Sequence, residues 1–247
     1  MYRLWLMVLT ALAAHGPLWA AEVSVAVAAN FTAPMQKIAQ SFEQQTGHRA
    51  SLSFGGTGAL YAQIKHGAPF EVLLAADAAI PAKIEQEGLG VPGSRFTYAT
   101  GRLVLWSKQP ALVDDQGAIL RSGQFERIAV ANPKLAPYGA AAVEAITRLG
   151  LLTDLQPKFV QGDNIAQTYQ FVATENAELG FVALSQVYAA GRINEGSAWI
   201  LPGHLYTPIQ QDAVLLMPGK ANPAAAALLA FLKGDQARSL IQSYGYQ

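Results

Sequence analysis

The 247-residue sequence contains no cysteine. Disulfide bonds, thiolate metal sites, cysteine nucleophiles and the lipidated cysteine of a membrane-anchored lipoprotein are therefore excluded. A chain without thiols is compatible with an oxidising compartment, because it has nothing to oxidise there. Any chemistry of the protein must come from backbone groups, hydroxyls, amides, carboxylates or amines.

Charge is scarce and balanced. Charged residues make up 14% of the chain, with 17 Lys and Arg against 17 Asp and Glu. Proteins that bind nucleic acid or an anionic membrane surface carry a clear excess of Lys and Arg, so both partners are excluded. An anionic ligand would have to be held by something other than bulk positive charge.

Recognisable catalytic motifs are missing as well. The sequence has no G-x-S-x-G elbow, and Gly55-Gly56-Thr57-Gly58 lacks the Lys-Ser/Thr ending of a phosphate-binding loop. The three histidines beyond residue 20 are scattered, and we expect them on exposed loops. Asp77 and Asp163 stand near strand ends, but without a second acid or a base at a fixed spacing. We therefore predict no catalytic residue, no protein ligand to a metal ion and no cofactor.

The first twenty residues have the features of a secretory signal peptide. Arg3 supplies a positive charge, and the following stretch to Ala14 is apolar except for Thr10. Small residues then offer a cleavage site after Ala20 or Ala21. The apolar stretch is shorter than the ~20 residues that a spanning helix needs. We predict an exported chain, free in solution, with a net charge of −1 because cleavage removes one of 17 basic residues and no acidic one.

Beyond the signal peptide, strand-like and helix-like segments alternate. Runs of β-branched and apolar residues predict strands at 23–27, 51–54, 71–74, 128–131, 158–161, 179–182 and 213–216. Apolar residues at helical spacing predict helices at 31–46, around 60–64, at 80–87, 139–149 and 165–173, and two more after Asn222-Pro223. This alternation predicts an α/β fold with mainly parallel sheets flanked by helices.

The order of these elements fits two lobes. Residues 95–106 form a long β-rich stretch around Gly101 that we expect to cross between the lobes, and the chain is expected to return near residue 212. Lobe 1 then comprises residues 21–100 and 213–247, and lobe 2 comprises residues 101–212. The C-terminal helices complete lobe 1.

Four strand-to-helix junctions are polar or rich in glycine, at 28–31, 55–58, 137–139 and 163–165. The first N–H groups of a helix lack intrahelical acceptors, and the helix dipole adds partial positive charge there. Junctions of this kind lie along one edge of an open parallel sheet, where together they can surround an anion with neutral donors. Taken singly, each junction is equally well explained by ordinary helix capping. Their repetition in both lobes favours a site for a small anion.

At the same junctions the sequence resembles the periplasmic molybdate-binding proteins of ABC transporters, which are class II substrate-binding proteins. The likeness runs over nearly the whole chain after the signal peptide. Its most characteristic stretch is Gly67-Ala68-Pro69-Phe70-Glu71-Val72 followed by Ala75-Ala76-Asp77. The resemblance implies a two-lobed periplasmic-binding-protein fold of type II with the ligand in the cleft. It also implies a monomeric, periplasmic, non-enzymatic protein that captures molybdate, and tungstate as well, for an ABC-transporter permease in the inner membrane.

The resemblance further implies which positions hold the oxyanion. Asn30 contributes its backbone N–H and its side-chain amide, and Thr57 contributes its backbone N–H and its hydroxyl. Tyr138 and Ile165 each donate a backbone N–H from the second lobe. The metal of the anion is then held through its oxygens, with no direct bond to the protein.

The resemblance also implies ligand-binding roles for Ala29 and Ala183. Some family members have at position 183 a tyrosine whose hydroxyl reaches the ligand. Ala183 cannot supply that contact through its side chain. Asp77 is typical of the family, and we expect it to cap a helix or to support the hinge.

Two alternatives stay open. A different tetrahedral oxyanion, such as sulfate or phosphate, suits the same fold, and a secreted α/β enzyme acting on a small anionic substrate is the alternative from another class. A site made only of donors favours a fully deprotonated dianion, because phosphate near pH 7 keeps a proton and needs an acceptor. Asp163 is the one acid that stands close enough in the sequence to supply an acceptor.

Overall fold

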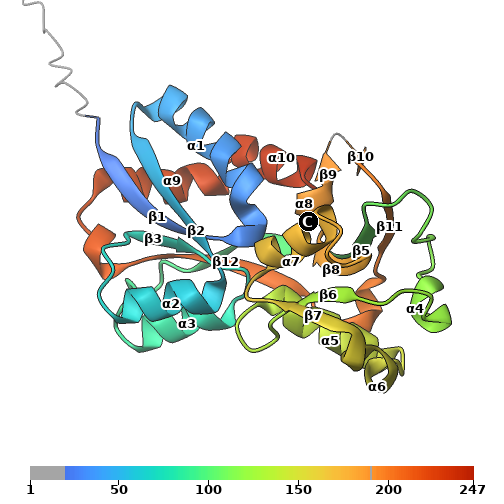
Figure 1. The fold of residues 1–247 in the computed structure, drawn as a ribbon. Coiled ribbons are helices and arrows are strands. Elements are labelled where there is room, and N and C mark those ends of the chain that lie inside the picture. The colour runs from blue at the N-terminus through green and yellow to red at the C-terminus, as the bar shows by residue number, and fades with distance from the viewer. Residues whose placement is uncertain (1–19, 190) are drawn as a thin grey trace, which may run out of the picture.

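The computed structural model of the protein describes residues 20–189 and 191–247 (Figure 1). Residues 1–19 of the predicted signal peptide lie outside the described residues. Within the described part of the chain, no helix is both long enough and apolar enough to cross a membrane.

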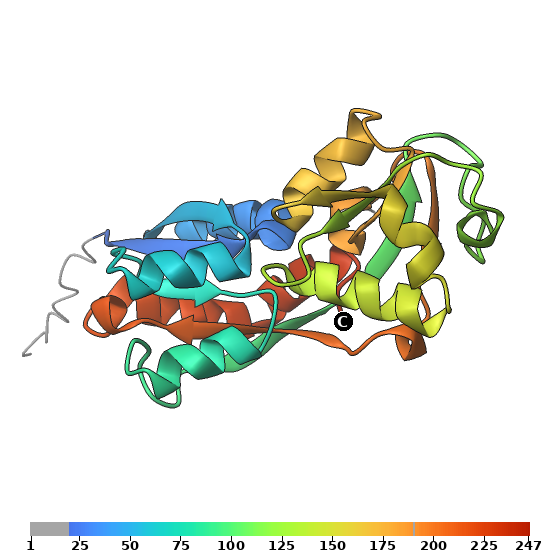
Figure 2. The ribbon, with the colours of Figure 1, turned by 60° about the horizontal axis from the view of Figure 1, so that its bottom comes forward.

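Two five-stranded sheets form the centres of two lobes, as the alternation of strands and helices predicts (Figure 1). The first sheet has the order β2-β1-β3-β12-β4, made of Arg49–Gly55, Glu22–Ala28, Val72–Leu74, Ile209–Leu215 and Phe96–Gly101. The second has the order β11-β5-β8-β6-β7, made of Ser197–Ile200, Leu103–Ser107, Leu179–Ala183, Ile128–Ala131 and Phe159–Gly162. Figure 2 shows the blue-to-cyan and red segments in one lobe and the green-to-yellow segments in the other.

Each sheet is mainly parallel, with a single strand that runs against the others. β1 pairs in parallel with β2 and β3, whereas β12 lies antiparallel between β3 and β4. β6 pairs in parallel with β7 and β8, whereas β5 lies antiparallel between β8 and β11. The two reversed strands are the ones that receive the chain after it passes between the lobes. β5 follows β4 directly, and β12 brings the chain back into the first sheet.

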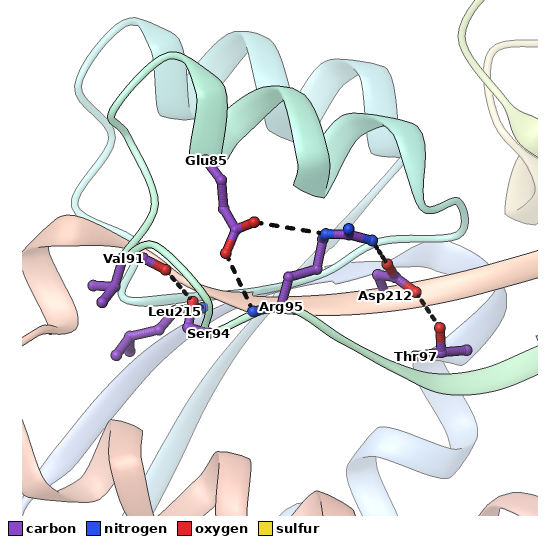
Figure 3. Close-up of polar contacts among 7 residues, drawn as sticks. All are labelled: Glu85, Val91, Ser94, Arg95, Thr97, Asp212 and Leu215. Atoms are coloured by element: carbon purple, nitrogen blue, oxygen red, sulfur yellow. Dashed lines mark hydrogen bonds and ion pairs between the residues drawn. The ribbon is translucent and has the colours of Figure 1, made fainter.

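Strand β12 begins at Ile209, four residues before the strand that the sequence predicts at 213–216. Its first half contains Gln211 and Asp212, which look like surface residues but are only 0% and 1% exposed. The register shifts between these two residues, and such a bulge allows both side chains to be buried. Asp212 pairs with Arg95 at 2.5 Å and accepts a hydrogen bond from the Thr97 hydroxyl at 2.7 Å (Figure 3). These contacts anchor the strand where it passes between the lobes.

Helices cover both faces of each sheet. In the first lobe α1 (Thr32–Thr46), α9 (Pro223–Lys233) and α10 (Asp235–Ser243) pack on one face, and α2 (Thr57–Lys65) and α3 (Ala79–Gln86) on the other. In the second lobe α5 (Pro137–Arg148) and α6 (Leu152–Leu155) lie opposite α7 (Ile165–Ala173) and α8 (Leu184–Val187). Shorter elements are α4 (Ile119–Ser122), β9 (Tyr188–Ala189), β10 (Arg192–Ile193) and the 3-10 helices η1 (Ala29–Phe31), η2 (Gln156–Lys158), η3 (Gly203–Leu205) and η4 (Met217–Gly219).

The C-terminal helices complete the first lobe, and the last residues of the chain lie beside β4. Thr100 and Gln247 exchange two backbone hydrogen bonds, at 2.8 and 3.1 Å. This pairing holds the preceding residue, Tyr246, in a buried position next to the strands that pass between the lobes.

One histidine departs from the expected exposure. His66 and His204 are exposed, but His48 is buried. Its Nδ1 accepts a hydrogen bond from the Ala21 N–H at 3.2 Å, and its ring lies near that of Phe42. The sequence gives little sign of this burial because Ala21 lies far from His48 along the chain.

Candidate anion-binding site

Four helix starts meet at one small cavity between the two lobes. The first lobe contributes η1 and the start of α2, and the second contributes the starts of α5 and α7. The cavity has a volume of about 10 Å³ and is lined by Ala28, Ala29, Asn30, Gly56, Thr57, Ala76, Ala136, Pro137, Tyr138, Asn164 and Ile165. The structure thus brings together Asn30, Thr57, Tyr138 and Ile165, with Ala29 beside them.

The two lobes are in direct contact around this cavity. The Gly58 N–H donates to the Leu135 carbonyl across the cleft at 3.3 Å. A Cβ atom on Gly56 would lie 3.2 Å from the Cβ of Asn164, so glycine at this position lets the second lobe approach closely. The structure is therefore that of a closed cleft.

Thr57 is the first residue of α2, and its hydroxyl does not cap that helix. Instead its Oγ1 accepts a hydrogen bond from the Ala76 N–H at 3.0 Å. A hydroxyl that accepts a bond from one side still has its own proton to donate. Since Thr57 is buried and lines the cavity, that proton is available to a ligand there. Helix capping, which the sequence left open for this residue, is not the role of its side chain.

The second lobe presents backbone N–H groups. Tyr138 is the second residue of α5, and Ile165 is the first residue of α7. N–H groups in the first turn of a helix have no intrahelical acceptor. The side chain of Asn164 caps α7 by accepting from Ala166 and Gln167, which leaves the Ile165 N–H uncapped. Ordinary helix capping is thus the role of the Asn164 side chain, whereas the N–H of the next residue, Ile165, remains available to a ligand.

Asn30 is only 2% exposed and is held by hydrogen bonds on several sides. Its Nδ2 donates to Gln211 Oε1 and to the Tyr246 hydroxyl, both at 2.9 Å. Its backbone carbonyl accepts from Ser185 Oγ at 2.8 Å. The last of these contacts crosses the cleft, because Ser185 belongs to α8 of the second lobe.

No charged side chain is among the residues that line the cavity. Asp163, which the sequence left as a possible acceptor, is exposed and is not part of the lining. Burial raises the pKa of the Tyr98, Tyr138 and Tyr246 phenols, so all three remain neutral near pH 7. The cavity is therefore lined by neutral groups only.

A larger groove of about 410 Å³ adjoins the cavity and has a different character. Asp77 and Glu144 both line it, and a hydrogen bond from the Thr207 N–H helps to lower the pKa of Glu144. Carboxylates of this kind repel a dianion. The small cavity is consequently the better anion site, although the groove is much larger.

Ala183 does not line the cavity, in contrast to the set that the family resemblance implies. It is fully buried at the end of β8, and its N–H donates to Gln186 Oε1 at 3.0 Å. The Nε2 of Gln186 in turn donates to the Ile165 carbonyl at 3.0 Å. The backbone of Ala183 therefore holds Gln186, and Gln186 in turn contacts the first residue of α7.

Asp77 caps the start of α3, because its Oδ1 accepts from the Ile80 N–H at 2.7 Å. Burial is the main cause that raises the pKa of this carboxyl, and hydrogen bonds from Ile80 and Ala79 offset it only in part. A raised pKa in the folded state means that folding takes up a proton. The contribution of Asp77 to stability is therefore present at acidic pH and is lost as pH rises through its folded pKa.

We accordingly expect Asp77→Asn to be at least as stable as the wild type at pH 8. The amide still accepts from Ile80, but it avoids the burial of a charge. The difference in the free energy of unfolding between the two proteins, measured in urea, should shrink as pH falls through the raised pKa of Asp77. If Asp77→Asn is less stable than the wild type at pH 8, and this deficit disappears at pH 4, the interpretation is contradicted.

Several residues around the site were not predicted from the sequence, namely Ser185, Gln186, Gln211 and Tyr246. Gln211 alone left a weak signal, as a polar residue just before an apolar strand. The others are brought to the site by pairings between distant parts of the chain.

Two lobes joined by strands that cross between them, closed over a cavity of neutral donors, are the features of a two-lobed solute-binding protein. The family of bacterial extracellular solute-binding proteins matches residues 23–247, and the chain belongs to this family. Its similarity is more specific than that. A molybdate-binding protein from Azotobacter vinelandii is 61% identical over 227 residues, which cover 92% of this chain and 90% of that protein.

Two further comparisons agree. A molybdate-binding protein from Rhodobacter capsulatus is 53% identical over 230 residues, covering 93% of this chain and 90% of the relative. The solved structure of a periplasmic molybdate-binding protein from Azotobacter vinelandii has a TM-score of 0.88 at 41% identity, and the match covers 91% of this chain and 98% of that one. The relatives are thus similar along essentially the whole described chain.

Proposed function

We propose that the protein captures molybdate in the periplasm and delivers it to the permease of an ABC importer in the inner membrane. The observation that carries this proposal is the closed cavity lined by four helix starts and by no charged side chain. The names of the relatives, which are molybdate-binding proteins at 61% and 53% identity, point to the same ligand. The protein acts as a monomer, without a cofactor and without turnover of the ligand.

In this proposal the anion is bound by donors from both lobes. Thr57 supplies its hydroxyl and its N–H, and Asn30 supplies its N–H and its amide, with the Ala29 N–H close by. Tyr138 and Ile165 supply backbone N–H groups from the other side of the cleft. Hydrogen bonds to charged groups are stronger than those between neutral groups. Binding through both lobes therefore stabilises the closed form that the permease recognises.

The donor set also explains selection among anions. Molybdate, tungstate and sulfate are fully deprotonated near pH 7 and accept hydrogen bonds at every oxygen. Phosphate keeps a proton and requires an acceptor, usually a carboxylate. The carboxylates of Asp77 and Asp163, which adjoin Ala76 and Asn164 in the sequence, are not part of the cavity lining. Molybdate and tungstate share shape and charge, so we propose that both bind.

Calorimetric titration of residues 21–247 with molybdate, tungstate, sulfate and phosphate tests the proposal. We expect saturable binding of molybdate and tungstate at one site, with phosphate weaker by about ten- to hundredfold, since an unpaired buried polar group costs roughly 1–3 kcal/mol. Bound anion should also raise the free energy of unfolding by RT ln(1 + [L]/Kd). Preference for sulfate over molybdate, or hydrolysis of phosphate or sulfate esters by the pure protein, would refute the proposal.

A further inference from the structure

Asn30 holds the one buried side-chain polar atom without a hydrogen-bond partner among the described residues, its Oδ1. The nitrogen of the same amide, Nδ2, donates hydrogen bonds to Gln211 Oε1 and to the Tyr246 hydroxyl. Neither of those residues lines the cavity, whereas Asn30 does. The unpaired end of the side chain is thus the one left for the ligand. An acceptor in this position would be repelled by a dianion.

An amide can turn over within the same volume, and its partners decide which end points where. If Asn30 turns over, its Oδ1 meets the Tyr246 hydroxyl and the Gln211 side chain. Gln211 must then turn over as well, so that its Nε2 donates to Asn30 and to the Tyr98 hydroxyl, which lies 3.0 Å from it. The Gln211 Oε1 then accepts from the Tyr138 hydroxyl, at the 3.0 Å separation already present.

This second arrangement pairs every polar group in the cluster. The Tyr98 hydroxyl accepts from Gln211 and donates to the Ala75 carbonyl, 2.9 Å away. The Asn30 oxygen gains the Gln211 Nε2 as a donor. The Tyr246 proton, which otherwise points to the Asn30 carbonyl, can also turn to this oxygen, because Ser185 Oγ still donates to that carbonyl. The Asn30 NH2 group now faces the cavity as a donor, in agreement with a wall made of neutral donors. The turned arrangement is favoured because it removes the unpaired buried acceptor.

Gln211 is well placed to control Asn30. Its backbone is fixed by the bulge and by the contacts of the adjacent Asp212 with Arg95 and Thr97 (Figure 3). A Cβ atom on Gly101 would collide with both the Tyr138 hydroxyl and the Gln211 amide. Glycine at position 101 therefore leaves the space in which these two side chains meet.

The cluster also joins the two lobes. Gln211 and Asn30 belong to the first lobe, whereas Tyr138 belongs to α5 of the second. A hydroxyl can donate to the oxygen end of an amide or accept from its nitrogen end, so Tyr138 adds a hydrogen bond across the cleft without choosing between the two ends of Gln211. Tyr98 makes that choice, because its proton goes to the Ala75 carbonyl and its oxygen can then only accept from the Gln211 Nε2.

We propose that Gln211, oriented by the Tyr98 hydroxyl, is a positioning residue that holds the NH2 group of Asn30 toward the anion. The inference rests on the proposed function. It fixes the orientation of one donor by contacts within the first lobe, so that the site prefers a fully deprotonated dianion.

The first test is Gln211→Glu, which replaces the amide with a group of the same shape that can only accept when ionised. Asn30 must then direct its NH2 group to the carboxylate introduced at position 211 and its oxygen to the anion. Affinities for molybdate and hydrogen phosphate are compared at about pH 9.5, where a buried glutamate is ionised. Both anions carry two negative charges there, so the added charge repels them equally. We expect the ratio of molybdate to phosphate affinity to fall at least about tenfold.

A purely structural role for Gln211 would lower both affinities by the same factor and leave the ratio unchanged. That result would overturn the proposal. Failure of the proposed function is distinguishable from this result, because in that case the wild type itself would not bind molybdate.

The second test introduces no charge. Tyr98→Phe keeps the ring but removes the hydroxyl that orients Gln211, and Tyr206→Phe is its matched control. The Tyr206 hydroxyl is also buried, but it lies in the second lobe, where it accepts from the Leu103 N–H at 3.1 Å. We expect Tyr98→Phe to lower molybdate affinity several-fold and Tyr206→Phe to leave it within about twofold.

The amide of Asn30 can be observed directly by NMR, with its side-chain NH2 signals assigned by their loss in Asn30→Ser. In the wild type these signals should shift when molybdate binds, and in Tyr98→Phe the shift should be smaller. Signals that do not respond to molybdate in the wild type would show that the oxygen of Asn30 faces the anion, and would overturn the proposal.

Discussion

Replacing Asn30 with aspartate is expected to lower the affinity for molybdate on the order of a thousandfold. The substitution keeps the shape of the side chain but puts a carboxylate beside a dianion in a cavity that has no charged lining. Two unit charges about 4 Å apart repel by roughly 4 kcal/mol at an effective dielectric constant near 20, which corresponds to about three decades in affinity. Calorimetric titration at pH 8 measures the effect.

Asn30→Ser is the matched control, because a serine hydroxyl retains a donor without a charge, and we expect it to lose no more than about tenfold. The aspartate variant should also regain affinity as pH falls and its carboxyl takes up a proton. If Asn30→Asp binds molybdate within tenfold of the wild type at pH 8, the side chain of residue 30 does not face the anion.

Thr57→Ala is expected to lower molybdate affinity by about ten- to hundredfold, since a hydrogen bond to a charged group contributes roughly 1.5–3 kcal/mol. The structure adds an effect that is independent of the ligand. The Ala76 N–H donates to Thr57 Oγ1, and the substitution leaves this buried donor unpaired. We therefore also expect the free energy of unfolding without anion to fall by about 1–3 kcal/mol.

Thr57→Ser separates the two effects, because serine keeps both the acceptor for Ala76 and the proton for the anion. Its affinity and its stability should both stay close to those of the wild type. An alanine variant that loses stability but binds molybdate as tightly as the wild type would show that the Thr57 hydroxyl only supports the Ala76 backbone.

Local patterns in the sequence predicted most of the fold. The bounds of β6 and α7 follow directly from their apolar runs and from the cap at Asn164, since strand pattern and helix capping depend on neighbouring residues. The start of β12 was missed because its polar residues look exposed. Their burial depends on Arg95 and Thr97, more than a hundred residues away, which no local pattern reveals.

The same distinction applies to the site. The helix starts at Thr57, Tyr138 and Ile165 could be predicted, because glycine, proline and capping residues mark them in the sequence. The cluster behind Asn30 could not, because Tyr246 is 216 positions away and reaches it only through the pairing of Thr100 with Gln247. Ala183 was included by resemblance, and its contact with Gln186 became evident only from the structure.

A cavity walled by dipoles rather than by lysine or arginine has a consequence for the surroundings in which the protein works. At 0.1 M ionic strength, salt largely screens the attraction between exposed charges that lie more than about 10 Å apart, but it acts much less on groups that are enclosed and away from water. The donors from both lobes are enclosed once the cleft has closed, so dissolved ions have little access to them. The rate at which the closed protein releases a captured anion should therefore be nearly the same in dilute and in saline media. Salt should change only the rate at which the anion associates.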